Sequence, residues 1–319
     1  MNEMRVEWGK IREFAIATGS RHPSYLDDEH APIPPTFLVT SIIWDRKDER
    51  PDHDPEREKA LAEVGIVHDL KGFLSGQHDY VFHAPLIRAG ERLIMADRFD
   101  GLEQRTGRRG GAMTLVRSTT EYRSPDGTLR AECRYTGIYV QAPPSDAADT
   151  PASNESATQA STSQPSAGGI SSTTVDTTTS EGELPSRSFG PVTLLDNVRY
   201  QGASGDMNPI HHDDEYARSA GYERAFSVGM LGAGYLATFC TDQFGHDTVR
   251  RLRVRFSDLV WTGDTLTAHG RVVRHFDANG ERRVELALAM VNQHGRVAVD
   301  GSAEFALNAD GPTTSASTH

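Results

Sequence analysis

Hydrophobic and polar positions alternate along the chain in two blocks, and the period differs between the start and the end of each block. Near each start, apolar residues recur every three or four positions, which predicts helices. Later they recur every second position over stretches joined by short turns, which predicts antiparallel strands. Helices are expected over 5–18, 213–220 and 229–243. Strands are expected over 79–83, 92–105, 111–123 and 129–140, and over 249–258, 265–276, 281–292 and 296–307.

A polar stretch separates the two blocks. Residues 150–180 hold 16 Ser or Thr among 31 and no aromatic side chain. Such a composition buries too little apolar surface to offset the entropy lost on ordering. We therefore expect an N-terminal domain over 1–141, a disordered linker acting as a passive tether over 142–188, a C-terminal domain over 189–308 and a disordered tail over 309–319.

The two blocks share a short sequence pattern. Pro85–Leu93 and Asp258–Leu266 both end in a glycine, an acidic residue, any residue and a leucine, and both lead into a predicted strand. A glycine turn and a final strand follow each copy, at Gly127 and Gly295. The same order of pattern, turn and strand in both blocks indicates a duplicated domain.

Composition and charge restrict the classes of partner. Among 319 residues, 33 Lys and Arg stand against 45 Asp and Glu, a formal net charge of −12. This argues against a nucleic-acid partner, which needs a basic face. Cys133 and Cys240 are too few for a disulfide framework and have no metal-binding spacing. No apolar run approaches the ~18 residues of a membrane span and no signal segment is present, so we expect a cytoplasmic protein without membrane partners.

The densest group of chemically active side chains lies between residues 200 and 217. Asp206 and His211 are five positions apart, with Asn208 and Pro209 between them. Pro209 fixes its own φ and biases Asn208 away from the helical region, while Gly205 permits a conformation that other residues resist. The sequence predicts a turn that aims a carboxylate and an imidazole at one point, as a general acid/base pair. The spacing leaves open which group is the acid and which is the base.

Gly229 begins the apolar segment that follows, and its backbone N–H at a helix N-terminus is a natural donor to a carbonyl oxygen. An enolate oxygen that develops in a thioester would be stabilised there, as in an oxyanion hole. An acid, a base and an oxyanion donor are the parts needed to add water across an α,β-unsaturated thioester. Because acid and base lie on one face of the substrate, the addition or elimination is expected to be syn.

Several neighbouring residues have simpler interpretations. Asn208 is assigned mainly to shape the turn, with orientation of the water or the ligand as the alternative. His212 is expected to face solvent or to support the site, and Ser204 lacks the Gly-x-Ser-x-Gly context of a nucleophile. His211, His212 and Asp213 have no further ligand at a suitable spacing, so no metal is expected, and no cofactor is implied.

Tyr200–Ala217 resembles the signature of the MaoC-like dehydratases, a family that includes the (R)-specific enoyl-CoA hydratases. The family motif Gly-Asp-x-Asn-Pro-[Ile/Leu]-His-x-Asp is met at every fixed position by Gly205–Asp213, and the likeness spans about 190–307. The resemblance implies an α+β hot-dog fold, a long antiparallel sheet wrapped around one central helix. It also implies that Asp206 and His211 are the catalytic pair and that Gly229 supplies the oxyanion N–H.

This chain departs from the family pattern at Val228, where the family usually has a histidine before Gly-Met-Leu. The change is tolerable if only the backbone N–H of Gly229 serves the carbonyl. A missing imidazole that ordered the pocket would instead alter the rate or the specificity.

The first block resembles the FAS1-like dehydratase half that precedes the MaoC-like half in double hot-dog dehydratases. The likeness runs from about 10 to 140 and rests on Phe14–Gly19, His22-Pro23, Ala31-Pro32 and Pro34–Phe37. This half holds no Asp-x-Asn-Pro-x-His turn, so the acid/base pair is expected to be lost there. The resemblance implies that this half shapes a tunnel for the acyl chain.

The leading hypothesis is reversible hydration of a trans-2-enoyl thioester to the (R)-3-hydroxyacyl thioester, carried by CoA or an acyl carrier protein. A hot-dog thioesterase and a non-catalytic subunit of a heteromeric dehydratase are the alternatives. A homodimer is implied by the resemblance. Two groups of arginines are expected either to face solvent or to bind the carrier of the acyl group: Arg108-Arg109 the phosphate of CoA or of a pantetheine carrier, and Arg251, Arg253 and Arg255 the phosphates of CoA or the acidic surface of an acyl carrier protein.

Overall fold

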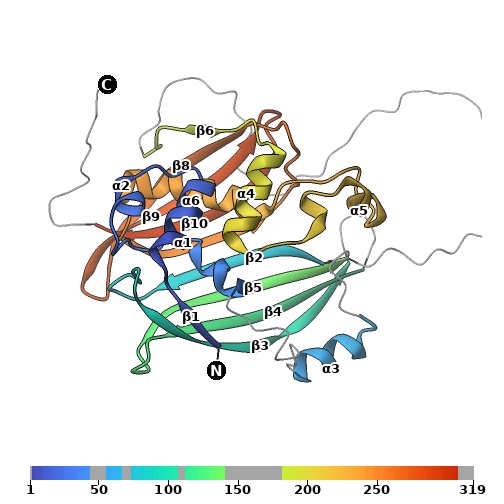
Figure 1. Ribbon diagram of the computed structural model, residues 1–319, viewed down its shortest axis with the longest axis horizontal. Helices are drawn as coiled ribbons and strands as arrows, with labels where there is room; N and C mark the ends of the chain where they lie inside the picture. Colours follow the sequence, from blue (N-terminus) through green and yellow to red (C-terminus); the bar gives the residue numbers. More distant parts are fainter. Residues whose placement is uncertain (1, 44–54, 67–72, 107–111, 141–181, 308–319) are drawn as a thin grey trace, which may run out of the picture.

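The computed structural model describes residues 2–43, 55–66, 73–106, 112–140 and 182–307. Within them, the strands form one ten-stranded antiparallel sheet in the order β1-β3-β4-β5-β2-β7-β10-β9-β8-β6 (Figure 1). The strands of the first half are β1 (Asn2–Arg5), β2 (Phe73–Phe82), β3 (Arg92–Thr106), β4 (Ala112–Arg123) and β5 (Leu129–Val140). Those of the second half are β6 (Arg187–Phe189), β7 (Val249–Phe256), β8 (Leu266–Ala278), β9 (Glu281–Asn292) and β10 (Val297–Ala306).

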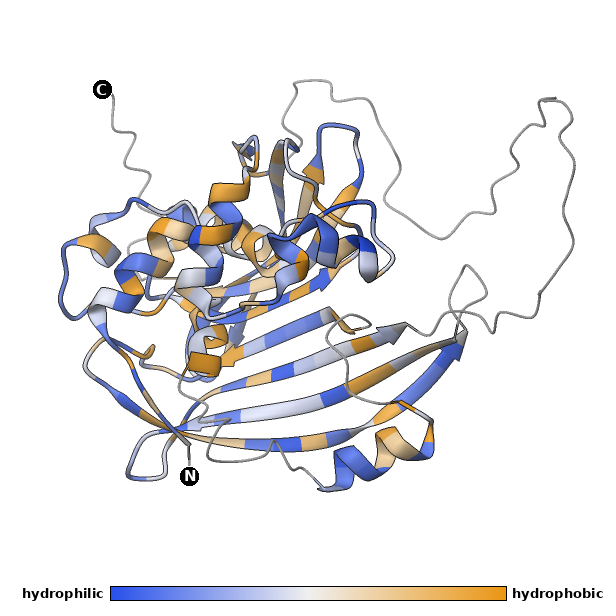
Figure 2. Cartoon of the chain, turned by 45° about the vertical axis from the view of Figure 1, so that its right-hand side comes forward, coloured by the Kyte–Doolittle hydropathy of each residue, from blue (hydrophilic) through white to orange (hydrophobic). Residues whose placement is uncertain are grey.

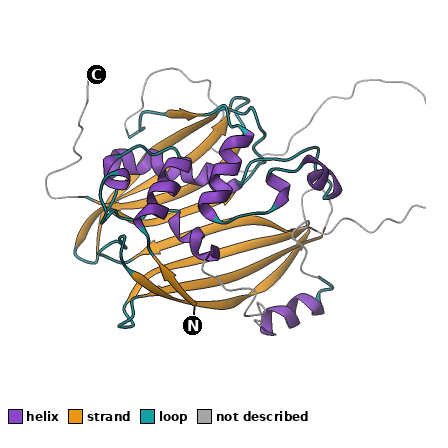
Figure 3. Ribbon diagram, viewed as in Figure 1, coloured by secondary structure: helices purple, strands orange, loops and turns teal. Residues whose placement is uncertain are grey.

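The described helices are short except for one (Figure 3). They are α1 (Trp8–Ala17), α2 (Pro23–Leu26), the 3-10 helix η1 (Phe37–Ile43), α3 (Pro55–Glu63), α4 (Leu194–Ser204), the 3-10 helix η3 (Pro209–His211), α5 (Asp214–Ser219) and α6 (Gly229–Phe244). The long helix, α6, packs against β7, β8, β9 and β10. None of the described helices is long and apolar enough to cross a membrane.

The two halves of the sheet have the same strand order. Read outward from the centre, the first half runs β2-β5-β4-β3-β1 and the second runs β7-β10-β9-β8-β6. The repeated sequence pattern precedes β3 in one half and β8 in the other, so the topology confirms the predicted duplication. The halves meet where β2 pairs with β7, which places Tyr80 opposite Leu252. Across this junction the guanidinium of Arg251 donates two charge-assisted hydrogen bonds of 2.8 Å to the carboxylate of Asp79.

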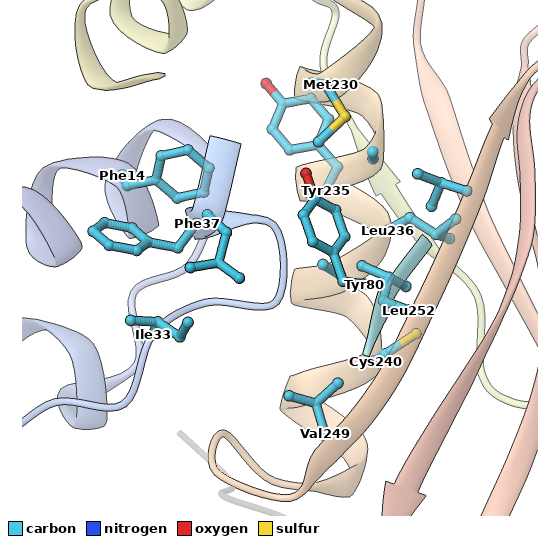
Figure 4. Close-up of a cluster of buried hydrophobic side chains, with 14 of the residues drawn as sticks. Phe14, Ile33, Phe37, Tyr80, Met230, Tyr235, Leu236, Cys240, Val249 and Leu252 are labelled. Carbon is cyan, nitrogen blue, oxygen red and sulfur yellow. The ribbon is translucent and has the colours of Figure 1, made fainter. Parts of the chain in front are cut away.

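One hydrophobic core serves both halves. Figure 4 shows Phe14 and Phe37 from the first half on one side of α6 and Leu236 on its other side, with Tyr80 on β2 and Leu252 on β7 close to the helix. The strands carry alternating hydrophobic and hydrophilic bands, as a period of two requires (Figure 2). Because α6 is buried on most of its surface, its sequence is apolar nearly all round.

The sequence predictions of the strands agree closely with the structure, except that β2 begins at Phe73 rather than at residue 79. The elements that were not anticipated are β1, β6, α2, α3, α4 and the two 3-10 helices η1 and η3. The start of α4 does carry a sequence signal, because Thr193 and Asp196 form a reciprocal capping box. The two predicted sheets are joined as one, because β2 and β7 pair.

The end of the expected linker needs correction. Residues 142–181 and 308–319 lie outside the described residues, so the tail and most of the linker stay predictions. Residues 182–188, however, pack against β8: the Leu184 N–H donates to the Gly270 carbonyl at 2.8 Å, and Arg187 of β6 pairs with Ala268 of β8. The backbone hydrogen bonds of an edge strand hold this segment, so the second folded half begins near residue 182 instead of 189.

Candidate active site

The predicted turn begins where α4 ends. Gly205 has a φ of 83° and closes the helix through a hydrogen bond of 2.8 Å from its N–H to the Gln201 carbonyl. This left-handed conformation favours glycine. A Cβ at this position would also lie 2.6 Å from Cγ1 of Ile43, on η1 of the first half. Glycine therefore permits both the turn and the close approach of the two halves directly before Asp206.

The turn itself is held by hydrogen bonds of Asn208. Its N–H donates to Oδ1 of Asp206 at 3.3 Å, and its own Oδ1 accepts from the Ile210 N–H at 3.2 Å as the cap of η3. Gln201 Nε2 donates to the Asn208 carbonyl at 3.0 Å, which ties the turn to α4. These contacts agree with the turn-forming role expected for Asn208.

His211 is 8% exposed and is fixed by its Nδ1, which lies 2.9 Å from the Phe226 carbonyl oxygen. A carbonyl oxygen only accepts, so Nδ1 carries the hydrogen. In a neutral ring this leaves Nε2 as a proton acceptor. The structure therefore defines both the tautomer and the orientation of the imidazole.

Asp206 and His211 act on each other electrostatically. Burial lowers the pKa of His211, and the charge of Asp206 opposes that shift. The net direction is downward, so the neutral imidazole is the form present near pH 7. The structure thus brings together the two side chains that the sequence paired, and their catalytic role remains a prediction.

Gly229 is the first residue of α6, so its N–H has no partner within the helix. A Cβ at this position would lie 3.0 Å from the ring of Phe256 on β7, so glycine keeps the helix start close to the sheet. Only three positions separate Gly229 from Phe226, whose carbonyl holds His211. Val228, between them, is buried in the core and makes no side-chain cap.

Asn197 on α4 is a supporting residue that the sequence interpretation missed. Its Nδ2 donates to the His211 carbonyl at 3.3 Å, and its Oδ1 accepts from the Ser227 hydroxyl at 2.8 Å. The side chain is fully buried and links the turn with the loop that leads to Gly229. The sequence carries a signal for Asn197, because a polar residue on the buried face of a helix with a capping box points to a side chain that makes buried hydrogen bonds.

The first half also contributes to the surroundings of the pair. Besides Ile43, the phenol of Tyr135 on β5 lies close enough to Asp206 for that charge to add to the effect of burial, and both raise the pKa of Tyr135. Tyr200 on α4 is affected in the same way. Asp206 therefore lies close to both α4 and the sheet of the first half.

The remaining candidates have structural partners. Ser204 Oγ accepts from the Asp206 N–H at 3.2 Å, His212 Nδ1 lies 2.9 Å from Gln201 Oε1, and Asp213 caps α5. Cys133 and Cys240 are free and buried. Within the described ranges, His, Cys, Asp and Glu side chains form no group of three that could hold a metal ion.

The structure describes the arginines of only one of the two groups that were expected to face solvent or to bind phosphate. Arg251 bonds Asp79, Arg253 donates to Gln77 at 3.0 Å, and Arg255 donates to Asp300 at 3.1 Å. All three alternate along β7 with the core residues Leu252 and Val254, so they lie on the outer face of the sheet. Arg108 and Arg109 lie outside the described residues.

A continuous sheet built from two like halves, with a long helix against one of them and an Asp/His turn at that helix, defines a double hot-dog protein. Comparisons with known proteins agree. Residues 2–132 match the family model of the FAS1-like dehydratase domain region, and residues 177–292 match that of the MaoC-like domain. The chain therefore carries a FAS1-like dehydratase domain region followed by a MaoC-like domain.

Solved structures with low sequence identity show the same fold. A MaoC-like dehydratase superposes with a TM-score of 0.68 at 21% identity and covers 95% of each chain. A Mycobacterium tuberculosis protein described as a double hot-dog fold has a TM-score of 0.60 at 12% identity, over 95% of this chain and 93% of the other. In sequence, 77 residues are 35% identical to peroxisomal multifunctional enzyme type 2 of Mus musculus. That segment is 23% of this chain and only 10% of the mouse enzyme.

Proposed function

We propose that the protein catalyses the reversible syn hydration of a trans-2-enoyl thioester to the (R)-3-hydroxyacyl thioester. The FAS1-like dehydratase domain region and the MaoC-like domain support a hydro-lyase. The observation that carries the specific proposal is the state of His211: it is buried and neutral, its Nδ1–H is bound to the Phe226 carbonyl, and Asp206 acts on it. This arrangement suits a base that takes a proton from water at Nε2.

In the proposed hydration, His211 Nε2 accepts a proton from a water molecule that Asp206 and His211 hold. The water oxygen forms a bond to Cβ of the enoyl group, and the electron pair of the double bond moves toward the thioester carbonyl. The Gly229 N–H stabilises the resulting enolate oxygen. The imidazolium, stabilised by the Asp206 charge, then returns the proton to Cα on the same face. Water is consumed, the thioester bond stays intact, and the reverse sequence is the dehydration.

The proposed substrate is an acyl thioester of CoA or of an acyl carrier protein, and the proposed assembly is a homodimer. The two free cysteines suit a reducing compartment, so the proposal places the enzyme in the cytoplasm.

The proposal is tested by the loss of enoyl absorbance with crotonyl-CoA and a longer trans-2-enoyl-CoA. Asp206→Asn and His211→Ala should each lower turnover at least ~10²-fold without loss of the fold. Asp213→Asn is the matched control, because this side chain belongs to the same motif and caps α5, a role that asparagine also fills, so the variant should keep near wild-type turnover.

Two results would contradict the assignment. Undiminished hydration in Asp206→Asn would remove the acid/base pair from the mechanism. Release of free thiol from the enoyl-CoA without loss of the double bond would instead identify a thioesterase. Chiral chromatography of the product checks the (R) configuration.

A further inference from the structure

The proposed mechanism makes no use of the buried imidazole of His78. His78 lies on β2 at the junction of the two half-sheets, paired with Tyr135 on one side and with Val254 on the other. It is 8% exposed. Its Nδ1 is 3.1 Å from the Tyr80 hydroxyl, whereas its Nε2 is buried and has no hydrogen-bond partner among the described residues. A buried polar atom of this kind is normally satisfied by protein, water or ligand.

The neighbours of His78 connect it to both parts of the candidate active site. Its ring lies 4.7 Å, between centroids, from that of Tyr135, which is close enough to Asp206 to feel its charge. On the other side its ring is 6.1 Å from that of Phe256, which packs at the start of α6 where Gly229 lies. His78 thus lies between the surroundings of the acid/base pair and those of the oxyanion donor.

Among the described residues, the side chains that surround His78 carry no charge. Tyr80, Tyr135, Cys133 and Phe256 contact it, and burial alone lowers its pKa to about 4, so the ring is neutral near pH 7. A neutral imidazole with one free nitrogen suits a neutral partner. A buried carboxylate would need a cation to offset its desolvation.

We propose that His78 is a specificity-determining residue that binds a neutral polar group, a hydroxyl or keto oxygen, on the acyl chain of the thioester. The inference rests on the proposed function and narrows its substrate class. A hydroxyl suits either tautomer of His78, because it both donates and accepts, and a keto oxygen suits the tautomer with hydrogen on Nε2. In this way the half without the Asp/His turn selects the substrate for the other half.

The test measures binding of saturated thioesters, which require no turnover. Isothermal titration compares hexanoyl-CoA, 5-oxohexanoyl-CoA, 6-hydroxyhexanoyl-CoA and adipoyl-CoA. The wild type should bind at least one neutral polar ligand roughly five- to tenfold more tightly than hexanoyl-CoA, the gain of one hydrogen bond. His78→Phe keeps an aromatic ring and should abolish this preference, and His78→Gln should restore part of it. His246→Phe is the matched control: His246 has the same 8% exposure but follows the opposite end of α6, so the preference should persist.

Three outcomes would overturn the inference. Equal affinities for the polar ligands and hexanoyl-CoA would mean that water alone satisfies Nε2. A preference that survives in His78→Phe would assign it to another residue. Tightest binding of adipoyl-CoA would indicate a charged acyl group, with Arg57 on α3, whose charge acts on Tyr135, as its partner. Hydration of crotonyl-CoA by the wild type is the control for the proposed function, because crotonyl-CoA has no polar group on its acyl chain. If the wild type hydrates crotonyl-CoA, a failed binding test contradicts only the role of His78.

Discussion

Acidification should destabilise the protein through His78, and the size of the effect follows from its burial. Burial lowers the pKa of His78 from the usual 6.5 to about 4. The unfolded chain therefore binds a proton that the folded chain does not, and stability is lost as the pH falls below 6.5. The full shift corresponds to about 3 kcal/mol, of which about 2 kcal/mol is lost between pH 7.5 and pH 5. The neighbouring Tyr80, Tyr135 and Cys133 have raised pKa values, so they stay neutral over this range.

Urea unfolding at pH 7.5 and pH 5, followed by tryptophan fluorescence, measures this loss in the wild type and in His78→Phe. The wild type should lose about 2 kcal/mol more on acidification than the variant. His22 and His211 also have lowered pKa values, but they titrate in both proteins and cancel in the difference. Identical losses in the two proteins would show that His78 takes up its proton in the folded state, and would refute the description of its site as buried and uncharged.

Three further perturbations test the architecture around the pair. Gly205→Ala should cost roughly 2 kcal/mol of stability, because φ is left-handed and the new Cβ meets Ile43, and an unchanged melting temperature would contradict this. Asn197→Ala should cost roughly 2–3 kcal/mol and lower turnover, because it unpairs the His211 carbonyl and a hydroxyl; a full-activity variant would show that neither bond positions the site. Deletion of 150–180 should change neither melting temperature nor turnover, and loss of either would contradict the role of tether.

The sequence predicted those parts of the molecule that depend on local pattern. Long strands follow from a period of two, and the Asp206 turn follows from glycine and proline at fixed positions. The sequence did not single out His78, because its proposed role depends on strand pairing with Tyr135 across the sheet and on the ring of Phe256 in the other half. The same holds for β6, a strand of three residues whose hydrogen bonds to β8 leave no periodic signal.

The first half has no Asp/His turn in its sequence, but it still contributes residues to the surroundings of Asp206. Gly205 packs against Ile43 of the first half, and the charge of Asp206 helps to raise the pKa of Tyr135 on β5. The surroundings of Asp206 therefore include residues from both halves. The core is likewise continuous across them, and β2 covers the edge of β7 that a separate MaoC-like domain would expose. In the proposed mechanism the chemistry needs only the turn of the second half, so the inner face of the first half is free to vary. In this chain that face carries His78 and Tyr135, and the proposed selection of the acyl group would act there without changing the reaction.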